Sequence, residues 1–413
     1  MNRLKNKLKD NDLKTVIKSF ASLSVLQIFN LILPLFALPY IARVIGVENF
    51  GLLAFSAAII VFFQTTIDYG FNYTAVRDMA RIRDDKEKTS YILSVVINTK
   101  IFLLLVSSTV LLILCLFVPL FKDNLLIIVL SFLIVPSSVF YQEWFFQSIE
   151  KMHLIALLSM LSKIFYLVTI FLFINQPKDF LLIPVFNAIS VLIVGVFSLY
   201  IVLFKYGYKI YIVSFKDIRD NLKLGFNMFI SLIAPNLYTN ISMIWLTQFW
   251  GKSPTAYFDS GYKVIGLSQI VTSVFSRAFF PLLSRKMDYH NFYKKINFII
   301  ALFSSLVLFF GADIFVDILF GRDYIEAVNV IKVMSITPFF ISLMNVYGTN
   351  YLVLKGKENI LRNIIISCSF FGLFLTFILV YYKGYIGAAY SIAIVWGVRG
   401  FLTMYFAKKM ERN

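Results

Sequence analysis

The stretch VVINTKIFLLLVSSTVLLILCLF, residues 95–117, is almost entirely apolar, and Lys100 is its one charged residue. A helix needs about 20 mostly apolar residues to cross the hydrocarbon core of a bilayer, and this run is long enough. The composition of the whole chain agrees, because 59% of the residues are hydrophobic and only 15% are charged. The mean hydropathy of +0.80 lies far outside the range of soluble globular proteins. The sequence therefore predicts an all-α integral membrane protein.

Apolar runs of this length recur along the chain with short polar joins between them, and they predict about twelve membrane-spanning helices. The expected bounds are 19–43, 51–75, 93–119, 125–146, 154–174, 180–204, 225–250, 256–280, 296–317, 327–354, 363–382 and 384–407. The basic start, MNRLKNKLKDNDLKT, is similar to the basic region of a signal peptide. The apolar run after it is too long and lacks a small-residue cleavage site, so we expect a retained first helix.

Lys and Arg residues are distributed unevenly between the joins. They cluster at the N-terminus, in the even-numbered joins and in the C-terminal tail, whereas the odd-numbered joins hold a single one each. By the positive-inside rule, both termini are expected to be cytoplasmic. The net charge of +17 is then a consequence of topology, and nucleic acid is excluded as a partner.

Several kinds of enzymatic site are excluded by their missing residues. Cys115 and Cys368 lie in separate apolar spans and form no CxxC pattern. His153 and His290 have no metal-ligand pattern beside them. The GKS sequence at 251–253 lacks the upstream glycine of a phosphate-binding loop. We therefore expect a protein that is not an enzyme and that needs neither a metal nor a cofactor.

Two segments about half the chain apart are similar to each other. VIGVENFGLLAFSAA contains Gly46 and FWGKSPTAYFDSGYK contains Gly251, and each begins an outward join before an even-numbered helix. They predict two six-helix lobes that are parallel repeats around a central cavity, where transporters of this kind bind their substrate. The expected lobes are 1–204 and 225–413, with a cytoplasmic linker at 205–224. The alternative is a chance match of two hydrophobic hairpins.

Basic side chains inside the spans are the candidate binding residues, because a charge at mid-bilayer costs roughly 2.5–3.5 kcal/mol. Lys163 lies near the middle of its span in any register, so it is either an inward-facing cation or the structural partner of a carboxylate on another helix. Lys100 and Arg399 either face inward as well or extend to the cytoplasmic headgroups. Lys263 and Asp259 form an i, i+4 pair, which either contacts a substrate or satisfies only itself.

Acidic and amide side chains complete the set of candidates. Asp68, Glu143 and Asp259 are candidates for ion coupling, although pairing of the first two with loop arginines such as Arg77 is the alternative. Four amides are expected to line a wet cavity, or else to form hydrogen bonds between helices. They lie near prolines in the first and seventh spans: Gln27, Asn30, Asn236 and Asn240.

Five motifs together resemble the bacterial O-antigen and polysaccharide flippases, the Wzx-type family of the multidrug/oligosaccharidyl-lipid/polysaccharide exporter superfamily. They are LPYIARVIGVENFGLLAF (38–55), DYGFNYTAVRDMA (68–80), WFFQSIEKM (144–152), ISLMNVYG (341–348) and IGAA (386–389). The similarity runs from the first helix to the last. The chain departs from the family at Phe145 and Ser148, where Leu and Gly are usual.

This resemblance implies that the protein moves an undecaprenyl-diphosphate-linked oligosaccharide from the cytoplasmic to the periplasmic leaflet of the inner membrane. It implies alternating access, ion-gradient coupling, and a cationic cavity for the diphosphate formed by Lys163, Lys263, Lys100 and Arg399. Membrane lipids, a polysaccharide polymerase and chain-length machinery are the expected neighbours. Two alternatives stay open. A drug or organic-cation antiporter needs a mainly acidic cavity, and a membrane-embedded polymerase needs a long loop, which this chain lacks.

Overall fold

The computed structural model describes the backbone of residues 2–82 and 85–412, and the side chains in these ranges except those of 2–32, 34, 35, 278, 281 and 412. All regular structure in the described ranges is helical. The first half contains α1 (Asn2–Asp68), α2 (Phe71–Ala80), α3 (Lys86–Phe117), α4 (Pro119–Asp123), α5 (Leu125–Phe132), α6 (Ser137–Phe140), α7 (Glu143–Ser148), α8 (Met152–Phe173), η1 (Pro177–Leu181), α9 (Leu182–Tyr200) and η2 (Ile201–Lys205). The second half contains α10 (Phe215–Ile233), α11 (Asn236–Trp250), α12 (Lys252–Arg285), η3 (Met287–Tyr289), α13 (His290–Leu319), η4 (Arg322–Tyr324), α14 (Ala327–Met334), α15 (Thr337–Leu343), η5 (Met344–Val353) and α16 (Glu358–Arg412).

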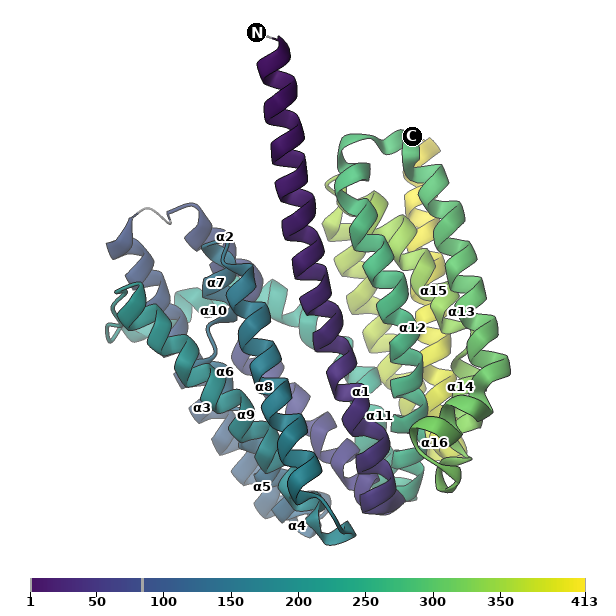
Figure 1. Cartoon of the computed structure of the whole chain (residues 1–413). Helices are drawn as coiled ribbons and strands as arrows, with labels where there is room; N and C mark the ends of the chain where they lie inside the picture. Colours follow the sequence, from purple (N-terminus) through teal and green to yellow (C-terminus); the bar gives the residue numbers. More distant parts are fainter. Residues whose placement is uncertain (1, 83–84, 413) are drawn as a thin grey trace.

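The helices form two lobes, as the sequence predicts. Figure 1 shows α2 to α9 on one side and α12 to α16 on the other, with the long first part of α1 between them. Helix α1 packs against α8 of the N-terminal lobe and against α12 of the C-terminal lobe. Its residues Ala42 and Ile45 belong to a buried core that is formed mainly by the C-terminal lobe and includes Ile170 of α8, and Phe63 and Ile67 belong to the core of the N-terminal lobe. Helix α1 therefore couples the two lobes.

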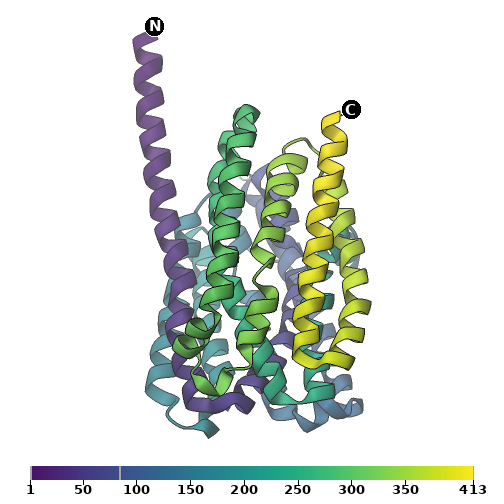
Figure 2. The same ribbon diagram turned by 90° about the vertical axis from the view of Figure 1, so that its right-hand side faces the viewer.

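The two ends of the chain lie at the same end of the molecule (Figures 1 and 2). Helix α2, which carries the basic residue Arg77, lies toward this end, and α4 lies at the opposite end. The sides of α3, α8 and α13 that face away from the lobes expose large apolar residues such as Leu112, Leu172 and Phe310. Such a surface is stable against lipid rather than water.

Gly46 and Gly251, which the sequence pairs as repeat equivalents, have the same unusual backbone conformation. Their φ and ψ angles are 76° and 172° for Gly46, and 90° and −169° for Gly251. A side chain strongly disfavours this region, whereas glycine enters it freely. At each glycine one helix ends and the next begins, so α1 turns back after Gly46 (Figure 2). The shared geometry supports the predicted duplication, while the predicted bounds of the lobes stay a prediction.

In the described ranges, nine helices are long and apolar enough to cross a membrane, or ten when the bent pair α10 and α11 counts as one span. This count does not confirm the predicted twelve membrane-spanning helices. It treats each of α1 and α16 as one helix, although α1 breaks at Gly46 and α16 breaks at Gly384, where φ is 57°. The sequence divides both helices at these places.

Several predicted spans consist of more than one helical element, and in the span 327–354 these are α14, α15 and the π-helix η5. The predicted span 125–146 consists of α5, α6 and α7, because Pro136 has no amide hydrogen to donate and Tyr141 is extended. The predicted span 225–250 bends by 55° between α10 and α11, beside Pro235. The bend lies beside a proline that lines a cavity, where interrupted helices are common in transporters.

Candidate functional site

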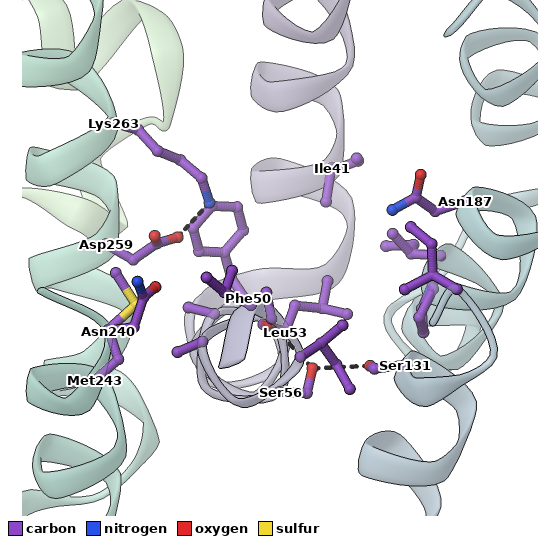
Figure 3. Close-up of a pocket in the computed structure, with 18 of the residues that line it drawn as sticks. Ile41, Phe50, Leu53, Ser56, Ser131, Asn187, Asn240, Met243, Asp259 and Lys263 are labelled. Atoms are coloured by element: carbon purple, nitrogen blue, oxygen red, sulfur yellow. Dashed lines mark hydrogen bonds and ion pairs between the residues drawn. The ribbon is translucent and has the colours of Figure 1, made fainter. Parts of the chain in front are cut away.

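A cavity of about 520 Å³ lies between the two lobes, and we name it the central cavity. Its walls come from α1, α5, α8 and α9 on one side and from α11 and α12 on the other. The volume falls within the usual range of small-molecule sites. Figure 3 shows Asp259, Lys263 and Asn240 on one wall and Asn187 on the facing wall. The polar and charged residues of its lining include Gln64, Ser131, Asn187, Asn240, Asp259 and Lys263.

Asp259 and Lys263 form a hydrogen-bonded ion pair on α12, one helical turn apart. The Asp259 side chain is only 7% exposed, whereas Lys263 is 42% exposed. The Lys263 Nζ also lies 4.5 Å from the centre of the Phe50 ring of α1, within cation–π range. An ammonium group has three hydrogens to donate, so Lys263 keeps donors for a ligand while its charge is balanced by Asp259.

The structure brings together four charged residues that are far apart in the sequence. The Lys100 Nζ donates to Asp68 Oδ1 at 3.0 Å and to the Ser138 carbonyl oxygen at 2.9 Å. Glu143 lies close enough to Asp68, Lys100 and Lys163 to interact electrostatically with each. We name Asp68, Lys100, Glu143 and Lys163 the charge cluster. It lies within the N-terminal lobe, and two acids and two bases balance each other there.

This arrangement decides between some of the alternatives. The extension of Lys100 to the headgroups is wrong, because its side chain is 3% exposed and bonded to Asp68. The pairing of Asp68 with Arg77 is also wrong, since Arg77 pairs with its neighbour Asp78 at 2.8 Å. For Lys163, the interaction with Glu143 favours the structural partner. Its predicted binding role stays a prediction, and among the described residues neither Lys100 nor Lys163 belongs to the lining of the central cavity.

Asn236 and Asn240 connect the lobes through a short chain of hydrogen bonds. The Asn240 Nδ2 donates to Asn236 Oδ1 at 3.0 Å, and the Asn236 Nδ2 donates to Thr65 Oγ1 of α1 at 3.3 Å. Asn236 therefore forms the contact between helices, whereas Asn240 bonds within α11 and lines the central cavity. Gln27 and Asn30 have side chains that lie outside the described residues, so their predicted positions are not tested.

Sequence reasoning missed two polar residues of the cavity wall, Gln64 and Asn187. Each lies in a strongly apolar stretch, IIVFFQTTI for Gln64 and LLIPVFNAI for Asn187. An isolated amide inside a membrane span is itself a signal of a wet or hydrogen-bonded position. The same criterion that selected Asn236 and Asn240 selects these residues once it is applied to the second and sixth spans.

At the end opposite the chain termini, next to the central cavity, α1 contacts helices α12 and α13 of the C-terminal lobe. In Figure 3 the part of α1 that carries Phe50, Leu53 and Ser56 is seen nearly along its axis, and all three residues line the central cavity. A Cβ atom added to Gly51 would lie 2.0 Å from the Lys252 carbonyl oxygen, so α1 and α12 touch through their backbones. We name this region the closed end.

Arg43 stabilises the closed end. Its Nη2 donates to the carbonyl oxygens of Asp317 and Ile318 at 3.2 and 2.8 Å. Both carbonyls belong to the last turn of α13, whose C-terminal dipole favours a cation. The contact joins the two lobes near Gly46.

Arg399 lies apart from these residues, in a second cavity of about 410 Å³ within the C-terminal lobe. We name it the C-lobe cavity. It is lined by residues of α11, α12, α15, η5 and α16, and it shares Asn240 and Tyr262 with the central cavity. The sequence thus assigns four cations to one cavity, but the structure separates them. Lys263 lies in the central cavity, Arg399 lies in the C-lobe cavity, and Lys100 and Lys163 lie in the charge cluster.

Comparison with known proteins identifies the family. The sequence profile described as polysaccharide biosynthesis protein matches residues 16–287. The chain belongs to this family. A candidate O-antigen transporter of Escherichia coli (strain K12) is similar to this chain, with 30% identity over 378 residues that cover 90% of this chain and 91% of that protein.

Solved structures share its fold. The lipid II flippase MurJ in an inward closed conformation aligns with a TM-score of 0.75 and 17% identity, over 94% of this chain and 87% of that one. An inward-facing multidrug resistance MATE transporter of the MOP superfamily aligns with a TM-score of 0.70 and 15% identity, over 94% and 98%. The chain thus has the two-lobe transporter fold, as its sequence predicts. The relatives are named transporters and flippases, which agrees with a protein that is not an enzyme.

Proposed function

We propose that this protein is a flippase for undecaprenyl-diphosphate-linked oligosaccharide repeat units of O-antigen or a related surface polysaccharide. The observation that carries the proposal is the central cavity, a space between the two lobes that holds an ion pair and several amides among apolar side chains, whereas the outer surfaces of the lobes are apolar. The family match and the O-antigen transporter relative support the class of substrate.

The chemistry of such a substrate explains why a cavity is needed. A diphosphate with attached sugars loses its hydration in hydrocarbon, and moving an unpaired ion there is prohibitively costly. Lys263 and the amides Gln64, Asn187 and Asn240 offer donors that replace water around the headgroup. The polyprenyl tail has no such cost and stays in the bilayer.

Alternating access is the proposed cycle. At the closed end, α1 is held to the C-terminal lobe through Arg43 and the contact between Gly51 and Lys252. The uneven distribution of Lys and Arg supports cytoplasmic termini, so the closed end faces the periplasm in this proposal. The headgroup enters from the cytoplasm, the closed end opens, and the lobes come together at the other end.

The Asp259–Lys263 pair offers a way to couple binding to ion movement. When an anionic headgroup takes hydrogen bonds from Lys263, the buried Asp259 carboxylate loses its partner. A buried carboxylate without a counter-charge is stabilised by taking up a proton. Asp68 and Glu143 of the charge cluster are further candidates for proton coupling. Equal transport by vesicles with and without a proton gradient would exclude the coupling.

The proposal is tested by the leaflet distribution of the lipid-linked repeat in a strain that lacks the gene. The strain is complemented with the wild type, with Lys263→Gln, or with the control Lys122→Gln, which removes an exposed lysine of α4 outside the cavity. We expect outward movement with the wild type and the control, and a loss of about tenfold or more with Lys263→Gln. An unchanged distribution in the deletion strain, with altered drug susceptibility instead, would contradict the proposal and favour an antiporter.

A further inference from the structure

The C-lobe cavity contains a cation that no carboxylate balances. Of the described residues that line it, only Arg399 is charged. No carboxylate of the described chain lies within ion-pair distance of Arg399. In the central cavity, by contrast, Lys263 is already paired with Asp259. The only unbalanced positive charge among the described lining residues of the two cavities is therefore in the C-terminal lobe.

Two donors of this cavity are left without acceptors. The Arg399 Nε and the Asn345 Nδ2 are buried and have no hydrogen-bond partner. Arg399 lies on α16 and Asn345 on η5, so the two donors come from different elements around one space. A buried donor without a partner costs about 1–3 kcal/mol, and native proteins rarely keep one without a reason. Both residues also line the C-lobe cavity, so these donors lie directly behind its wall.

The surroundings suit a hydroxyl-rich anion. The amides of Asn236, Asn240 and Gln269 line the cavity together with the aromatic rings of Tyr262 and Trp396. Two irregular features of the backbone also contribute to its walls. One is the bend between α10 and α11, and the other is the π-helix η5. Interrupted helices at membrane depth occur where the chain surrounds a polar cavity, and π-helical turns are frequent at functional sites.

We propose that the C-lobe cavity is a second binding subsite that holds an oxyanion of the transported headgroup on Arg399 and Asn345. The oxyanion is the carboxylate of an acidic sugar or a phosphate group. Guanidinium is the side chain best suited to bidentate binding of either. Because the C-lobe cavity shares Asn240 and Tyr262 with the central cavity, one headgroup can occupy both. The inference rests on the proposed function for the nature of the headgroup, but its test requires no transport.

The test is equilibrium binding to the purified full-length protein in detergent, with sodium glucuronate, inorganic pyrophosphate and neutral glucose as probes. Tryptophan fluorescence reports binding, because Trp396 lines the cavity, and Trp396→Phe identifies its share of the signal. We expect glucuronate or pyrophosphate to bind more tightly than glucose. The preferred anion identifies the sugar carboxylate or the phosphate as the ligand.

Variants locate the binding. Arg399→Gln is expected to weaken anion binding about tenfold or more, and the control Lys122→Gln, which changes an exposed lysine outside both cavities, is expected to leave it within about twofold. If Arg399→Gln does not fold, Asn345→Asp takes its place, since it places an isosteric carboxylate beside the anion and is expected to abolish binding. Anion binding that survives these changes, or that is lost equally in Lys122→Gln, overturns the subsite. Loss of anion binding in Arg399→Gln supports the subsite even if the test of the flippase proposal fails.

Discussion

Replacement of Asp68 by Asn is expected to destabilise the protein more than replacement of its partner Lys100 by Met. The two side chains share a hydrogen-bonded ion pair at 3.0 Å, but they differ in burial, with Lys100 at 3% and Asp68 at 45% exposed. The charge that each variant leaves behind therefore differs in its access to water. The loss of one partner is costly when the remaining charge is buried, and it costs little when water solvates it.

The magnitudes follow from this asymmetry. Asp68→Asn leaves the buried Lys100 ammonium with the Ser138 carbonyl and the nearby Glu143, and we expect a loss of about 3 kcal/mol. Lys100→Met leaves a partly solvated carboxylate and removes hydrogen bonds, and we expect a loss of about 1 kcal/mol. The double variant contains neither charge, so its stability is expected to resemble that of Lys100→Met.

The assay is the free energy of unfolding of the purified protein, measured by titration of detergent micelles with a denaturing detergent. The melting temperature provides an independent rank order. Arg77→Gln is the control, because its pair with Asp78 is exposed and worth little. If Lys100→Met proves as destabilising as Asp68→Asn, or if the double variant is the least stable of the three, the assignment of burial in the charge cluster is refuted.

The closed end supports two further predictions. Gly51→Ala is expected to weaken the contact between α1 and α12 by about 1–3 kcal/mol, because its Cβ would lie 2.0 Å from the Lys252 carbonyl oxygen. The assay is the labelling of a cysteine that replaces Ala54 in the central cavity by a reagent added from the periplasm. We expect this labelling to increase in Gly51→Ala. The control Gly266→Ala has no atom within 4 Å of the added Cβ and should not change the labelling. Arg43→Gln removes the cation that donates to the Asp317 and Ile318 carbonyls, and we expect the same increase, of about tenfold or more. Unchanged labelling in Arg43→Gln would show that these hydrogen bonds do not hold the closed end.

The fold was predictable from local features of the sequence. Hydropathy and the distribution of charge follow directly from the bilayer as solvent, and they gave the membrane class and the positions of most spans. Gly46 and Gly251 were found as repeat equivalents from sequence alone, and their matching backbone angles support that interpretation. The interruptions at Tyr141 and within η5 were not predicted, because they depend on packing around the chain rather than on its hydropathy.

The partners of the charged residues were less predictable. Asp68 and Lys100 are 32 residues apart on different helices, and whether they meet depends on the rotation of each helix about its axis. A shift of one residue turns a side chain by about 100°, which hydropathy does not resolve. Only the pair Asp259 and Lys263 was visible beforehand, because an i, i+4 spacing fixes the contact within one helix. The separation of Arg399 into its own cavity required the three-dimensional arrangement of the C-terminal lobe.

The most direct test of the account is transport by the purified protein in lipid vesicles that contain an undecaprenyl-diphosphate-linked oligosaccharide. A membrane-impermeant glycosidase added outside cleaves only the glycan that reaches the outer leaflet. We predict that wild-type protein and Lys122→Gln expose the inner pool of glycan, and that Lys263→Gln exposes it at least about tenfold more slowly. Wild-type vesicles whose inner pool stays as protected as that of protein-free vesicles would contradict the central claim that the cavity between the lobes carries the headgroup across.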